Sequence, residues 1–245
     1  MSSVTGHIVN HGSLKIVRSF INGLGAEYNP SNDKIKIANI DLLLSSQTNA
    51  FKTVNAKSIP WVNAVNARVD VLKPLDKTLT KVLNSLKSTE ASVEVIADAR
   101  SRINKIKGVR ATPKIVMDPT DPAVPTDTSV NQISAAQTDI NHIIDNFQNL
   151  IMLLEAEPLY DPAETDITTA ALGTLLSSIV TANDEVIAAF PAFDNARIAR
   201  NEVLYGVDGG HEIQLKVKKY VLSIFGAKDK RYHQISGVKF TKPKL

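Results

Sequence analysis

The chain has 245 residues, of which 43% are apolar and 5% aromatic, and a net charge of +3. The absence of cysteine excludes disulfides, thiolate metal sites and cysteine nucleophiles. Few aromatic residues and abundant Ala, Leu, Ile and Val favour packed helices over a β-sandwich. No stretch approaches the roughly 18 apolar residues of a membrane span, and the N-terminus lacks a signal-peptide pattern. A soluble, cytoplasmic protein is therefore expected.

Residues 1–115 are predicted to form helices. Apolar residues at positions 14, 17, 20, 21 and 24 form a stripe at helical spacing. A second helix is expected over about 32–57, and a turn at Pro60 should reverse the chain into a third helix from Trp61. That helix breaks at Pro74. Two further helices are expected over 75–86 and 90–105, the last capped by Thr89.

A proline-rich connector is predicted over residues 116–128. The stretch 108–128 contains four prolines, which forbid a regular helix and favour an extended chain. We therefore expect this segment to join two helical parts of the chain.

Residues 129–245 repeat the same kind of pattern. A heptad seam runs through 129–157, with Thr128 or Ser129 able to cap the helix and Pro158 to end it. Helices follow over 164–190, from Phe193 after a turn at Pro191, and over 212–225, with a break at "GVDGG" (206–210). The next residues, 227–234, allow only a shortened helix or none.

The two halves are related in sequence. Residues 28–72 and 160–204 align without a gap and share 17 identities in 45 positions, where chance would leave about three. Small residues recur in both copies and predict a close approach of antiparallel helices near the proline turns. These are Ala50, Ala56, Ala64 and Ala67, which match Ala182, Ala188, Ala196 and Ala199.

We predict an all-α fold of two tandem, related antiparallel helical bundles of about four helices each. The first helical unit covers residues 1–115 and the second covers 129–245; they are called the first and second repeats below. In the stretches 195–205 and 217–240 and the turns at 29–30 and 161–162, the chain resembles an uncharacterised family of all-helical bacterial proteins. This resemblance implies tandem helical units and adds no activity.

Sequence motifs of common chemistry are absent: there is no GxGxxG, P-loop, HExxH or GxSxG pattern. His7 and His11 are four residues apart, and His142 lies between two aspartates, but surface polar residues are the favoured interpretation over a metal site. The acidic turn at 155–166 is interpreted as solvated. No catalytic residue, cofactor or metal site is predicted.

Arg68 and Arg200 occupy equivalent positions in the two repeats. One interpretation is anion binding. The favoured one is that each side chain covers apolar surface and pairs with a carboxylate, such as Asp70 or Glu202 or one on a neighbouring helix.

The C-terminal segment is the uneven electrostatic feature. Residues 211–245 carry a net charge of +7, which leaves −4 for the rest. A candidate surface for an anion, a nucleic acid or another partner is predicted here. It comprises Lys216, Lys219, Lys228, Lys230, Arg231, Lys239 and Lys242. Ile235, Val238 and Phe240 repeat the apolar spacing of 106–111, so the segment should rest on the second bundle.

Three classes of function are compatible with these features. The favoured hypothesis is a non-enzymatic helical scaffold or protein-interaction module, because the residues shared by the repeats are packing residues. A carrier of a small apolar ligand in a bundle core is the second. A binder of anions or nucleic acid through the basic C-terminal segment is the third.

Overall fold

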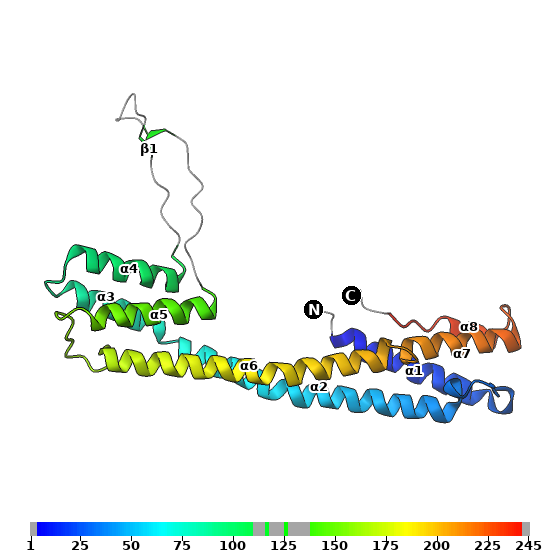
Figure 1. Ribbon diagram of the computed structural model, residues 1–245. Helices are drawn as coiled ribbons and strands as arrows, with labels where there is room; N and C mark the ends of the chain where they lie inside the picture. Colours follow the sequence, from blue (N-terminus) through cyan, green and yellow to red (C-terminus); the bar gives the residue numbers. More distant parts are fainter. Residues whose placement is uncertain (1–3, 110–115, 118–124, 127–137, 242–245) are drawn as a thin grey trace. The chain divides into compact units, whose positions relative to one another are not determined.

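The computed structural model describes residues 4–109, 116–117, 125–126 and 138–241 (Figure 1). Helices make up nearly all of the regular structure in these ranges, so the all-α class is confirmed. The α-helices are α1 (Val4–Gly23), α2 (Ile37–Leu72), α3 (Leu75–Lys87), α4 (Val93–Lys107), α5 (Ile140–Glu155), α6 (Thr169–Tyr205), α7 (Gly210–Phe225) and α8 (Lys230–Ser236).

Short elements connect the helices. Two 3₁₀ turns, η1 (Gly25–Glu27) and η2 (Asp33–Ile35), precede α2. The strands β1 (Val116–Met117) and β2 (Pro125–Thr126) pair antiparallel. They fall within the predicted proline-rich connector, most of which lies outside the described residues.

The chain divides into two compact units. One is built from two separate segments and the other from a single long segment. Residues 1–62 and 189–245 form the terminal unit, and residues 63–188 form the central unit. Because α2 and α6 pass residues 62 and 188, each of these helices contributes to both units. Each compact unit therefore contains residues of both repeats. The compact units divide after residues 62 and 188, whereas the predicted repeats cover residues 1–115 and 129–245.

The core of the central unit lies among α3, α4, α5 and the first part of α6. Helix α4 packs against both α3 and α5 (Figure 1). Apolar residues at three- and four-residue spacing bury one face of α3, and Phe147 fills the facing side of α5. The fully enclosed side chains include Leu79, Val82, Leu86, Phe147, Leu150 and Leu172.

The core of the terminal unit lies among α1, the first part of α2, α7 and α8. Both α1 and α8 pack against α7 (Figure 1). The predicted stripe of α1 faces this core, with Leu14, Val17 and Ile21 fully buried. Val217 and Val221 of α7 and Ile235 of α8 pack against it.

Side-chain caps mark the observed starts of two helices. Helix α4 begins at Val93, because the Ser92 hydroxyl accepts a hydrogen bond from the Val95 amide and so caps the helix in place of Thr89. Helix α5 begins at Ile140, where the Asp139 carboxylate accepts a hydrogen bond from the Asn141 amide; the predicted start at residue 129 lies outside the described residues. The predicted breaks at Pro74 and at residues 206–210 are confirmed.

The predicted turns at Pro60 and Pro191 are wrong, because both prolines lie inside single long helices. A proline in a helix leaves the carbonyl four residues earlier without its N–H partner, here the carbonyls of Ala56 and Ile187. Both of these residues are exposed, so water can bond the freed carbonyls. The two helices pass each other here, and Trp61 stacks on Phe193 with ring centres 5.1 Å apart.

The repeated alanines are only partly in close contacts. Ala64, Ala182 and Ala196 are buried, whereas Ala56 and Ala188 are exposed in both copies. Ala67 and Ala199 are likewise exposed. Burial is therefore shown for a subset of these positions, and the predicted close approach of the helices stays a prediction.

Candidate functional site

Two of the seven predicted basic residues are held in ion pairs. Lys216 Nζ lies 2.9 Å from an Asp208 carboxylate oxygen and 2.7 Å from one of Glu212. Arg231 pairs with Asp229 and Glu27, each at 2.9 Å, and its guanidinium lies 3.7 Å from the centre of the Phe225 ring. Hydrogen bonds from Arg231 lower the pKa of Asp229 to about 2. Both cations are therefore engaged by carboxylates of the terminal unit.

The other members of this predicted surface are more accessible. Lys219, Lys228, Lys230 and Lys239 are exposed and make no ion pair with any residue in the described ranges. They belong to α7, the α7–α8 loop, α8 and the segment after α8. Lys242 lies outside the described residues.

The segment after α8 is bound to the terminal unit through its backbone. Gln214 Nε2 donates to the Val238 carbonyl at 2.8 Å, and Lys218 donates to the Ser236 carbonyl at 3.1 Å and to that of Val238. Val238 and Phe240 pack against the core formed by α1, α2, α7 and α8. The prediction that this segment is held by its apolar residues is confirmed up to residue 241, and its contacts include the first repeat.

Asn10 of α1 fixes the end of this segment. Its Nδ2 donates to the Thr241 carbonyl at 2.7 Å, and its Oδ1 accepts from the Thr241 amide at 2.9 Å. Asn10 also donates to the Tyr205 hydroxyl at 2.9 Å. A single buried amide thus joins residues that are 231 positions apart.

The interpretation of His7 and His11 as surface residues is wrong. They are 2% and 9% exposed. His7 Nδ1 lies 2.7 Å from the Tyr205 hydroxyl, and His11 Nδ1 lies 2.8 Å from Gln47 Oε1. Their spacing of four residues places them on one helix face. Nothing in the sequence indicates that this face is buried, because its partners come from α2 and α6.

Gly210 permits a close contact in the same region. A Cβ at this position would lie 2.4 Å from Gln47 Nε2 and 3.2 Å from the Phe240 ring. Gln47 Nε2 and Gln214 Oε1 are fully buried and have no hydrogen-bond partner. The second glycine of the predicted break therefore leaves room for the Gln47 and Phe240 side chains.

The predicted carboxylate partners of the two repeated arginines are wrong. Arg68 donates to the Asn183 side-chain oxygen at 2.9 Å, and Asp70 pairs with Lys73 at 2.6 Å. Arg200 donates to the side-chain oxygen of Asn201. Residues two positions apart on a helix point in different directions, which is why neither Asp70 nor Glu202 reaches its arginine.

Helix α1 has an exposed face that is apolar and uncharged, called its outer face below. Ile8, Val9 and Ile16 are 57%, 63% and 50% exposed. They lie within about 100° of arc on the helix, together with Gly12 and Ser19. A Cβ at Gly12 would meet no atom within 4 Å, so the space over this face is open.

A shallow groove lies beside the C-terminal segment. It has a volume of about 420 Å³ and is lined by α7, the end of α8 and residues 238–241. Lys218 and Lys239 contribute its charge, and Leu215 and Phe240 contribute apolar surface. This groove is on the surface of the terminal unit and not inside a bundle core.

Within the described ranges, no three His, Asp or Glu side chains gather in a way that could hold a metal ion. None of the helices seen there is both long enough and apolar enough to cross a membrane. No family model, curated protein or solved structure matches the chain.

Proposed function

We propose that the protein is a non-enzymatic helical interaction module whose partner binds the outer face of α1. This exposed face carries the proposal. Exposed apolar side chains that gather on one helix face are typical of an interaction surface. In α1, Leu14, Val17 and Ile21 bury one face, while Ile8, Val9 and Ile16 on the other face remain in solvent.

The charge of α1 supports a protein partner. Its only lysine and arginine, Lys15 and Arg18, lie beside the outer face and not within it. Arg18 is engaged with Asp41 through two hydrogen bonds of 2.7 Å. Depletion of charge at the centre of a surface patch is typical of the core of protein–protein interfaces.

We also propose that the module arose by tandem duplication of a unit of about four helices. Residues 132 positions apart have matching environments in α2 and α6, as in Val54 and Val186, both 9% exposed. The Tyr28 hydroxyl donates to the Ile35 carbonyl at 2.7 Å, and the Tyr160 hydroxyl donates to the Ile167 carbonyl at 2.8 Å. Burial raises the pKa of both phenols, that of Tyr160 to about 12.

A second candidate function rests on the exposed lysines. Lys219, Lys228, Lys230 and Lys239 provide charge without a carboxylate partner in the described ranges, which suits an anionic surface or nucleic acid. Binding through these lysines should weaken steeply as salt is raised, whereas binding through the outer face of α1 should not. The shallow groove does not favour a carrier of a small apolar ligand, because it lies on the surface and is lined by charged as well as apolar side chains.

The test is a double substitution on α1, Ile8→Glu with Ile16→Glu, in the full chain. Partner capture and self-association are measured by cross-linking with mass spectrometry and by light scattering. We expect association to weaken at least tenfold, since two apolar contacts are replaced by charges. The melting temperature should stay within about 2 °C of the parent because both side chains are exposed.

Leu42→Glu on α2 is the matched control, because Leu42 is 66% exposed and lies off the outer face. It should leave association unchanged. Equal loss of association in the control, or full association of the α1 double variant, would contradict the proposal.

A further inference from the structure

A buried cation in the terminal unit lacks a carboxylate partner. Arg200 is 6% exposed. Its Nε and Nη2 groups donate to Asn201 Oδ1 at 3.2 and 2.8 Å, and no carboxylate of the described residues lies within ion-pair distance. A neutral amide does not offset the charge of a guanidinium removed from water. An anion bound to this guanidinium would therefore offset the cost of burying its charge.

A second arginine lies beside it. Arg197 is one turn earlier on α6, so the two side chains share a helix face. Arg197 pairs with Asp194 at 3.0 Å, and its guanidinium lies 5.6 Å from the centre of the Phe193 ring. Burial lowers the pKa of Arg200, and the nearby charge of Arg197 lowers it further. Asp194 offsets the charge of Arg197, whereas no carboxylate of the described residues offsets that of Arg200.

His7 of α1 faces the same charges. It is 2% exposed, and its Nδ1 lies 2.7 Å from the Tyr205 hydroxyl. Its pKa is lowered by burial and then by the charges of Arg200 and Arg197. The positive charges on α6 therefore act on a buried ring of α1.

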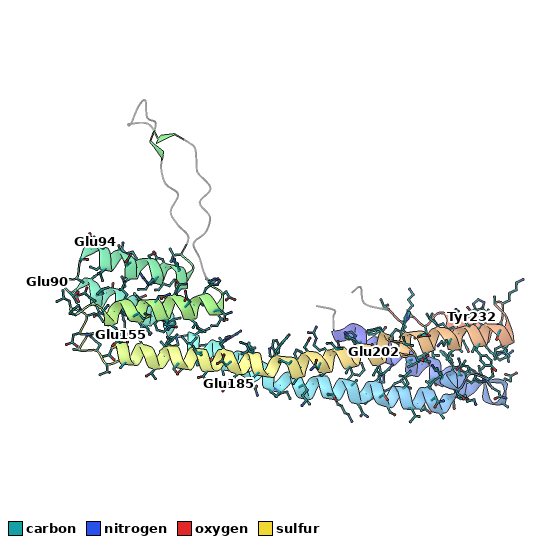
Figure 2. All side chains as sticks on the ribbon, viewed as in Figure 1. Glu90, Glu94, Glu155, Glu185, Glu202 and Tyr232 are labelled. Carbon is teal, nitrogen blue, oxygen red and sulfur yellow. The ribbon has the colours of Figure 1, made fainter. Side chains whose placement is uncertain are left out.

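The nearest carboxylate in sequence is turned away. Glu202 lies on α6 two positions after Arg200 (Figure 2). A Cβ on Gly206 would lie 2.0 Å from its Oε1, so the carboxylate occupies the space over that glycine. It therefore leaves Arg200 unpaired.

We propose that Arg200, with Arg197 and His7 beside it, binds a small oxyanion, the carboxylate or phosphate group of a ligand. Asn201 occupies one edge of the guanidinium, formed by Nε and Nη2. The other edge, formed by Nη1 and Nη2, presents two parallel N–H groups, the arrangement that carboxylates and phosphates accept side by side. The site lies on the buried side of α1, so it is independent of the outer face.

The first experiment measures thermal unfolding of the full chain in Tris chloride while inorganic phosphate or acetate is added at constant ionic strength. A ligand bound only by the folded state raises the melting temperature in a saturable manner. We expect this for the parent with at least one of the two anions, and the anion that acts identifies the chemical class.

The variants locate the site. R200Q should lose the response or shift its midpoint at least tenfold to higher anion concentration. R68Q is the matched control, because Arg68 is the repeat equivalent of Arg200 and is satisfied by Asn183; it should respond like the parent. If R200Q does not fold, R200K keeps the charge, removes the two-pronged edge and should show the same loss.

R200M gives a readout that does not need the ligand. Without oxyanions it should be at least as stable as the parent, because an unpaired buried charge is replaced by an apolar chain of similar length. Strong destabilisation of R200M would mean that Arg200 has its partner within the chain, and the proposal would fail. It would also fail if chloride stabilised the parent equally, or if R200Q kept the full response, which would place the anion on the exposed lysines.

Discussion

At the scale of single residues, identity between the repeats does not by itself mark a buried position. Ala64 and Ala196 are 9% and 7% exposed, while Ala67 and Ala199 are exposed one turn later on the same helices. All four are identical between the repeats. Identity between the repeats at these positions therefore does not distinguish buried alanines from exposed ones; only their burial in the structure does.

Ala64→Leu and Ala196→Leu should each destabilise the protein by about 1–3 kcal/mol, because a larger side chain cannot fit a close helix contact. Urea unfolding followed by circular dichroism measures this change. Ala67→Leu and Ala199→Leu are the controls and should change stability by no more than about 0.5 kcal/mol. Equal effects at all four positions would show that helix propensity and not packing governs them.

At the scale of elements, the two prolines inside α2 and α6 show how tertiary packing overrides a local signal. Each lies within a helix of 36 or 37 residues, although an interior proline costs about 3 kcal/mol. Trp61 packs on Phe190 and Phe193 beside them. These contacts and the remaining helix bonds keep the helices continuous.

Pro60→Ala and Pro191→Ala should therefore stabilise the protein, each by up to about 3 kcal/mol, by restoring an N–H that can bond the carbonyl four residues earlier. Chemical denaturation measures the gain. Pro74→Ala is the control, because Pro74 precedes α3 with φ −74°, a conformation that proline favours; it should give no gain. A loss of stability in Pro60→Ala would mean that the proline is needed for the helix path.

At the scale of the whole molecule, the two ends of the described chain close one compact unit. Asn10 bonds the backbone of Thr241, and Tyr205 contacts both His7 and Phe240. The terminal unit therefore cannot complete its core until the last segment has been added. This makes its folding dependent on contacts between residues far apart in the sequence.

Deleting residues 238–245 should destabilise the terminal unit by about 2–4 kcal/mol, since two or three apolar side chains lose their burial. Hydrogen exchange in the parent should show protected amides between residues 235 and 241, and Asn10→Ala should reduce the protection at Thr241. Unprotected exchange over 235–241 would indicate a free basic arm and would favour the anion-binding function of the exposed lysines.

The sequence by itself determined the helical class, the breaks at Pro74 and at residues 206–210, and the apolar stripes of α1 and the C-terminal segment. These features depend on residue spacing and on the local chemistry of proline and glycine, which act within a few neighbours. The basic character of the C-terminal segment was also apparent from the sequence, but which of its cations are ion-paired was not.

Only the tertiary structure decided which helix faces are buried and which polar residues meet. The continuous path through Pro60 and Pro191, the burial of His7 and the absence of a carboxylate at Arg200 depend on contacts between α1, α2 and α6. Such contacts join residues up to about 200 positions apart, and a single sequence does not specify them, because periodicity identifies a face of a helix and not the element that covers it.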